Sequence, residues 1–137
     1  MFTHNTPYRV RYADTDQMGY VYYGHYARLY EIGRVEALRA IGMTYKALEE
    51  SGVMMPVYDL KCRFIQPAKY DDLLTIRTHV MALPAARMVF TFEVLNQDGT
   101  LLNTGETTLV FVRMSNNRIT TAPKEMIERL KEVGDWK

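Results

Sequence analysis

The chain has 137 residues, of which 47% are hydrophobic and 24% are charged, with 17 basic and 16 acidic side chains. This length fits a single domain (residues 1–137) with its own core, and the hydrophobic fraction excludes a disordered chain. The net charge of +1 excludes a chain-wide field for nucleic acid, and no run of about 18 apolar residues is present to cross a membrane.

The sequence also indicates a cellular compartment. Cys62 is the single cysteine, so no disulfide can form within the chain, and this fits a reducing environment. Residues 1–8 lack the basic region and the apolar run of a signal peptide. We therefore expect a cytoplasmic protein.

The first third of the chain predicts a strand, a loop and a long helix. Residues 8–12 alternate aromatic or aliphatic side chains with two arginines, which predicts a short strand. Residues 14–24 are rich in Asp, Thr and Gly and predict a loop. Residues 25–41 follow with helical periodicity, and Gly42 is placed to end the helix. Because this helix is apolar over more than half its girth, we expect it to be largely buried.

Two polar residues have predicted structural roles next to this helix. Arg34 lies off the helix's polar side, so we expect it to be paired or at an interface. Thr44 is placed to cap a short helix over residues 45–50, which Gly52 ends.

After Pro56 the hydrophobic period changes from 3.6 to 2, which predicts strands. We expect four strands in an antiparallel meander, with a hairpin turn at 96–99 before the last: about 60–65, 74–80, 88–94 and 101–113. Pro123 is placed to open a terminal helix to about Val133, with Thr121 or Ala122 as its cap. A buried helix against one antiparallel sheet is an α+β arrangement, and exposed sheet edges favour dimer formation.

Asp14 and Asp16 are the first candidates for chemistry. Two carboxylates two residues apart point to different sides of an extended backbone, and in a loop such residues commonly hydrogen-bond local amides. The helix that starts near Gly24 changes their significance, because its first N–H groups and its dipole stabilise negative charge. A carboxylate close to that site can attack a carbonyl or activate water.

The other polar residues give weaker signals. His25 is either a base or donor, or simply a polar residue at a helix start, and His79 is expected to be solvated on a sheet face. The three His and one Cys show no metal-ligand spacing, so we expect no metal and no separate cofactor. Arg63 and Arg87 are possible phosphate contacts or ordinary solvated side chains.

Two blocks of sequence resemble the 4-hydroxybenzoyl-CoA thioesterase family. The first is RYADTDQMGYVYYGHY (residues 11–26), followed by Tyr30 and Glu31. The second is RFIQPA (residues 63–68), followed by DDL at 71–73. The likeness is greatest to the branch that includes the thioesterase linked to the Tol–Pal system. It implies a hot-dog fold, in which a curved antiparallel sheet wraps a long buried helix.

The resemblance also implies roles for individual residues. Asp16, the second Asp of the D-x-D motif, is the expected nucleophile or general base. The amide of Tyr23, helped by Gly24, is expected to polarise the thioester carbonyl, and His25 is a further substrate contact. Related branches often have His in place of Tyr23 and Asn in place of His25.

For the rest of the substrate, the resemblance implies that Arg63 and Arg87 bind the coenzyme A phosphates. It implies a homodimer or homotetramer with active sites at the dimer interface, and an acyl-CoA substrate that brings its own coenzyme A. Two alternatives stay open: a hot-dog hydratase or dehydratase that uses His25 with a carboxylate, and a non-catalytic acyl-binding module.

Overall fold

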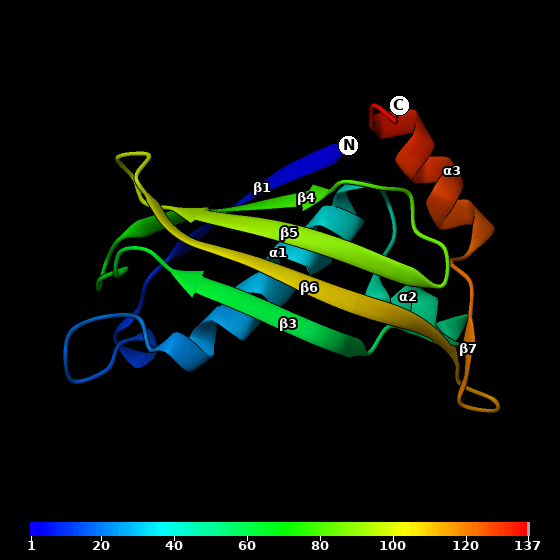
Figure 1. The fold of residues 1–137 in the computed structure, drawn as a ribbon, viewed down its shortest axis with the longest axis horizontal. Coiled ribbons are helices and arrows are strands. Elements are labelled where there is room, and N and C mark those ends of the chain that lie inside the picture. Colours follow the sequence, from blue (N-terminus) through cyan, green and yellow to red (C-terminus); the bar gives the residue numbers. More distant parts are fainter. Residues whose placement is uncertain (137) are drawn as a thin grey trace.

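The computed structural model describes residues 1–136, which form one curved sheet and three helices (Figure 1). In chain order the elements are β1 (Phe2–Arg9), the 3-10 turns η1 (Tyr12–Asp14) and η2 (Tyr23–His25), α1 (Tyr26–Ala40), α2 (Tyr45–Glu50), β2 (Val53–Met54), β3 (Val57–Phe64), β4 (Leu73–Val80), β5 (Arg87–Leu95), β6 (Leu101–Arg113), β7 (Arg118–Thr120) and α3 (Lys124–Val133).

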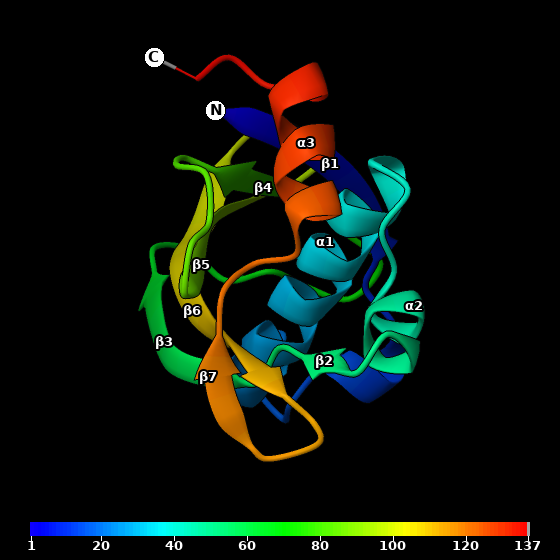
Figure 2. The same ribbon diagram turned by 90° about the vertical axis from the view of Figure 1, so that its right-hand side faces the viewer.

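The sheet is antiparallel throughout, and its long strands lie in the order β1–β4–β5–β6–β3. The short strands β2 and β7 both pair with the end of β6. The sheet curls around α1, and α3 packs beside one end of that helix (Figure 2). This confirms the predicted α+β class and the hot-dog arrangement of a long helix inside a curved sheet.

The core lies between α1 and the concave face of the sheet. Leu29 and Tyr30 of α1 are fully buried against Phe90 and Phe92 of β5, and the rings of Tyr30 and Phe92 stack 4.5 Å apart. Gly33 allows close approach, because a Cβ there would lie 2.6 Å from Thr78 Oγ1. The predicted burial of the helix is therefore confirmed. No helix among residues 1–136 combines the length and apolar character needed to cross a membrane.

The helix ends agree with the sequence. Gly42 follows α1 with a φ of +80°, the left-handed conformation that glycine adopts readily. The Thr44 hydroxyl accepts a hydrogen bond from the Ala47 N–H (3.0 Å) and caps α2. Arg34 is buried and donates from Nε to the Tyr45 hydroxyl (2.9 Å), so its expected pairing is confirmed. The predicted cap of α3 is wrong, because Pro123 itself occupies that position without a side-chain hydrogen bond.

The first strand differs from the prediction. It covers Phe2–Arg9 rather than residues 8–12, and Tyr12 lies in a 3-10 turn. All eight residues of β1 pair with β4, although residues 2–6 lack a regular apolar alternation. Tertiary pairing therefore sets the strand, as is common for sheets. The chain turns after Val10 because Asp14 accepts the Arg11 N–H, which is incompatible with continued strand pairing.

The predicted four-strand meander is also wrong at its first step. β4, β5 and β6 follow one another as a meander, but β3 pairs with β6 instead of with β4. The chain from β3 to β4 crosses the open end of the curled sheet through residues 65–72 (Figure 1). This crossing brings residues 65–67 beside the loop that precedes α1, where the candidate site lies.

Gly105 on β6 leads to a prediction about stability. The Tyr30 ring lies directly over it, and a Cβ at this position would overlap that ring. Tyr30 cannot move aside, because it is fully buried and stacked on Phe92. We expect Gly105→Ala to lower the free energy of unfolding by about 1–3 kcal/mol, the usual range for overpacking. Chemical denaturation measures this. Gly105 does not adopt the left-handed conformation, so the expected loss comes from the clash alone. Equal stability of Gly105→Ala and wild type would contradict the packing described.

Candidate active site

The loop before α1 is a small hairpin that holds Asp16. The Tyr22 N–H donates to the Asp14 carbonyl (2.9 Å), Thr15 and Val21 form an isolated bridge, and the Asp16 N–H donates to the Tyr20 carbonyl (2.9 Å). The hairpin is joined to the β3–β4 connection because the Val21 N–H donates to the Ala68 carbonyl (2.8 Å). The loop predicted from composition is therefore an ordered, hydrogen-bonded structure.

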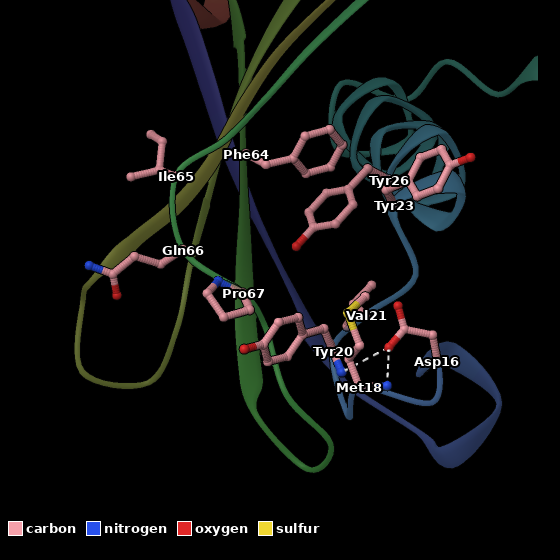
Figure 3. Close-up of a pocket in the computed structure, with 10 residues that line it drawn as sticks. All are labelled: Asp16, Met18, Tyr20, Val21, Tyr23, Tyr26, Phe64, Ile65, Gln66 and Pro67. Carbon is pink, nitrogen blue, oxygen red and sulfur yellow. Dashed lines mark hydrogen bonds between the residues drawn. The ribbon is translucent and has the colours of Figure 1, made fainter.

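Asp16 is half-buried, and its two carboxylate oxygens have different environments. Oδ1 accepts the N–H groups of Met18 (2.9 Å) and Tyr20 (3.3 Å). Gly19 allows this turn with a φ of +80°. Oδ2 has no hydrogen-bond partner among residues 1–136, and Figure 3 shows it facing away from the two amides. One oxygen therefore fixes the side chain and leaves the other available.

The start of η2, which follows the hairpin loop, has backbone N–H groups without a carbonyl partner in the part of the chain that the structure describes. The 3-10 turn of Tyr23–His25 continues directly into α1, and within the described chain the N–H groups of Tyr23 and Gly24 donate to no backbone carbonyl. Such groups at a helix start, together with the helix dipole, stabilise an oxygen that gains negative charge. The backbone at Tyr23 is thus suited to hold a carbonyl oxygen.

Asp16 and Tyr23 line one cavity of about 280 Å³. Its wall is largely aromatic and aliphatic, and it comes from the hairpin loop, the start of α1, the end of β3 and the connection that follows β3 (Figure 3). These residues are Met18, Tyr20, Val21, Tyr26, Phe64, Ile65, Gln66 and Pro67. The Phe64 ring meets Tyr26 edge to face, with centroids 5.3 Å apart. An apolar wall beside one carboxylate suits an apolar group attached to a reactive carbonyl.

Tyr26 adds a neutral hydroxyl to this wall. Burial, with a smaller contribution from neighbouring Cys62, raises the pKa of Tyr26 to about 12. The ring is therefore uncharged at physiological pH and can serve as a hydrogen-bond donor. Among the described residues, Asp16 is the one carboxylate that lines the cavity.

Asp14 faces away from the cavity and is buried, with 5% of its surface exposed. Oδ2 accepts the Tyr8 hydroxyl (2.8 Å) and the Arg11 N–H (2.9 Å), and Oδ1 accepts Arg28 Nη1 (3.2 Å). Burial alone would raise the pKa of Asp14, but these hydrogen bonds and the Arg28 charge together lower it. The expectation that the two aspartates point to different sides is confirmed.

His25 is placed at the helix start but outside the cavity wall. Its Nε2 lies 3.3 Å from the Ala13 carbonyl, and its ring meets Tyr22 edge to face. The imidazole therefore joins the base of the hairpin to the helix start. Gly24 lies beneath Tyr22, where a Cβ would be 2.6 Å from the ring.

The two predicted arginines are not brought together within this chain. Arg63, on β3, lines a second and more polar hollow of about 360 Å³ with Lys61, Thr104 and Glu106. Arg87, at the start of β5, stacks on the Tyr58 ring at the opposite end of the sheet, 4.8 Å from its centroid. Neither lines the cavity with Asp16.

The structure corrects one minor prediction and adds residues to the site. His79 is not solvated: it lies between Thr3 Oγ1 and Glu93 Oε1, each 2.8 Å away, with 16% of its side chain exposed. Phe64 and Tyr26 line the cavity, which the sequence patterns did not indicate. Phe64 lies in RFIQPA (residues 63–68), the second block that resembles the family, so this motif was the available signal that it belongs to the site.

Comparison with known proteins finds acyl-CoA thioesterases among the relatives of this chain. An acyl-CoA thioester hydrolase, YbgC, of Escherichia coli O6:H1 is 33% identical over 126 residues, which span 92% of this chain and 94% of the relative. A putative acyl-CoA thioesterase of Bacillus subtilis, YneP, is 33% identical over 92 residues, 67% of each chain.

A solved structure and a family model extend the likeness to the whole fold. The crystal structure of a DHNA-CoA thioesterase from Staphylococcus aureus superposes with a TM-score of 0.91 at 28% identity, covering 97% of this chain and 91% of the other. The model of the thioesterase-like superfamily matches residues 10–130, which include the hairpin loop, both predicted motif blocks and the cavity wall. This chain therefore belongs to the thioesterase-like superfamily.

Proposed function

We propose that the protein hydrolyses an acyl-CoA thioester to a free acid and coenzyme A. One observation is the main support: a single cavity with an apolar wall is lined by Asp16, which has one free carboxylate oxygen, and by Tyr23, whose N–H donates to no carbonyl in the described chain. The likeness to acyl-CoA thioester hydrolases and thioesterases supports the same reaction.

The chemistry follows from these groups. The thioester carbonyl oxygen accepts the Tyr23 N–H, with Gly24 beside it, and gains negative charge there as the carbonyl is attacked. Either Asp16 attacks the carbon and forms an acyl–Asp16 anhydride that water cleaves, or Asp16 takes a proton from an attacking water. In both routes the C–S bond breaks and the thiol of coenzyme A leaves.

We place the chain in the 4-hydroxybenzoyl-CoA thioesterase-like branch that includes the Tol–Pal-linked enzyme. The support is the sequence of residues 11–26 and 63–68, which form the hairpin loop and the cavity wall. We propose a cytoplasmic location, because the single, unpaired Cys62 fits a reducing compartment.

We propose a homodimer formed through β3 as the smallest active unit, whether or not two dimers pair into a tetramer. Two of the long strands, β1 and β3, are edge strands. β1 carries Pro7 and exposes mainly polar side chains, features that oppose further pairing. β3 exposes apolar side chains along its length, among them Tyr58 (64%), Leu60 (45%) and Phe64 (53%). An exposed apolar edge strand is suited to pair with a second copy.

Charges along β3 favour one antiparallel register. When Leu60 faces its own copy across the two-fold axis, Asp59 faces the partner's Lys61, an attractive cross-strand pair. A shift by one residue on the axis places the two Lys61 side chains opposite each other, which is unfavourable.

This register gives both predicted arginines a shared role. The start of one β3, where Tyr58 lies in a bulge, comes beside Cys62 and Arg63 of the other copy, so the partner's Arg87, which stacks on its own Tyr58, comes near Arg63. The polar hollow at Lys61 and Arg63 would then hold a third cation from the second copy. We propose that this group binds the coenzyme A phosphates.

A free-thiol assay with short, long and aromatic acyl-CoAs tests the function. We expect thiol release from at least one class, with equimolar free acid. Ligand-induced stabilisation of the fold without thiol release from any substrate would instead identify an acyl-binding module. Formation of a double bond without thiol release would identify a hydratase or dehydratase, although no histidine lines the cavity among residues 1–136.

A further inference from the structure

Asp14 is the other carboxylate of the D-x-D motif, and the hydrolysis reaction does not use it. It is buried, it faces away from the cavity, and three donors from separate segments converge on it: the Tyr8 hydroxyl of β1, the Arg11 amide and the Arg28 guanidinium of α1. Arg28 Nη1 also donates to the Tyr8 hydroxyl (3.0 Å). The side chains of Tyr8, Asp14 and Arg28 therefore each contact the other two. The Arg11 contact is local and typical of a turn, but a turn-forming aspartate needs neither the Tyr8 nor the Arg28 contact.

The backbone of Asp14 connects this cluster to the reacting groups. Its carbonyl accepts the Tyr22 N–H (2.9 Å), and Tyr22 immediately precedes the Tyr23 amide. Asp16 lies two residues along the same strand of the hairpin, and its own N–H closes the next rung with Tyr20. Both parts of the site therefore extend from a residue whose side chain joins the hairpin to β1 and α1.

We propose that Asp14 is a positioning residue, whose buried carboxylate holds the hairpin of residues 14–22 against β1 and α1 and so sets the separation between Asp16 and the Tyr23 amide. This inference rests on the proposed function, since it concerns the geometry of the same reaction. A displacement of about 1 Å in such a constellation can lower a rate about a hundredfold.

Two variants in the cluster and one control outside it test the proposal. Asp14→Asn keeps the size of the side chain and its acceptor oxygen but loses the charge that pairs with Arg28. Tyr8→Phe keeps the buried ring and removes one donor, so it is the milder change if Asp14→Asn folds poorly. Leu130→Ala, in α3, is a control that destabilises the core away from the cavity.

We expect Asp14→Asn to lower kcat at least tenfold with KM within threefold of wild type, and Tyr8→Phe to lower kcat by less. Leu130→Ala should lower the melting temperature as much or more, yet leave kcat unchanged when assayed well below that temperature. Amide hydrogen exchange should quicken in residues 12–25 of Asp14→Asn and stay near wild type across β5 and β6. A kcat within twofold of wild type for both Asp14→Asn and Tyr8→Phe would overturn the proposal.

The exchange measurement separates this inference from the proposed function. If wild type hydrolyses no acyl-CoA, the reaction is wrong, but faster exchange limited to residues 12–25 in Asp14→Asn still supports the role of Asp14 in holding the hairpin. If Asp16→Asn is inactive while Asp14→Asn exchanges and reacts like wild type, Asp16 keeps its role and the positioning role of Asp14 is wrong.

Discussion

Replacement of Asp16 by Asn is expected to lower kcat more than a hundredfold with a modest change in KM. The substitution keeps the shape of the side chain, and the amide oxygen can still accept the Met18 and Tyr20 N–H groups that fix it. The free carboxylate oxygen is lost, so neither a nucleophile nor a base remains in the cavity. An interaction that acts mainly in the transition state is lost, which lowers kcat rather than substrate binding.

Steady-state kinetics with the best substrate of the thiol assay measures this effect. Asp98→Asn is the matched control, because Asp98 lies in the exposed β5–β6 turn, outside the cavity wall, and should retain wild-type kcat. Near wild-type turnover by Asp16→Asn would show that the catalytic assignment is wrong. A pre-steady-state burst of thiol in the wild type would favour the nucleophilic route, because it reports a covalent intermediate that accumulates.

Most of the fold could be predicted from the sequence, because strands with one buried face show a clear alternation of apolar and polar residues. The alternation along β4, β5 and β6 and the broad apolar surface of α1 agree with the structure. The pairing of β3 was not predictable from order along the chain. An eight-residue connection (65–72) permits either a hairpin or a crossing of the sheet, and the pairing of β3 with β6 rests on long-range contacts.

The candidate site was predictable in its motif but not in its assembly. Local spacing placed the two aspartates near a helix start. The family resemblance singled out Asp16 and Tyr23, and both line the cavity. Phe64 comes from a segment some 40 residues away, which no local periodicity connects to the loop. The burial of Asp14 was likewise hidden, because its partners Tyr8 and Arg28 come from a strand and a helix on either side of the loop.

Replacement of Leu60 by Asp is expected to convert the proposed dimer to a monomer and to lower kcat/KM at least tenfold. In the favoured register the two Leu60 side chains meet across the axis, and two carboxylates there would repel each other and lose their apolar contact. The monomer also lacks the partner's Arg87 beside Arg63, so KM for acyl-CoA should rise. Light scattering after gel filtration measures the mass. Val89→Asp, a change at an exposed apolar residue of the central strand β5, should remain a dimer.

Cysteine cross-linking then distinguishes the register from the mere existence of a dimer. In a Cys62→Ser background, Leu60→Cys should form an intermolecular disulfide, because directly opposite residues in an antiparallel pair have Cα atoms about 4.5–5.5 Å apart, within disulfide reach. Lys61→Cys in the same background should cross-link poorly, since its counterpart is then offset along the strand. Efficient cross-linking through Lys61→Cys alone would show that the two-fold axis lies at Lys61 rather than at Leu60. Asp59 would then not face the partner's Lys61. A wild-type monomer that hydrolyses acyl-CoA at full rate would show that one chain binds coenzyme A without Arg87 of a second copy.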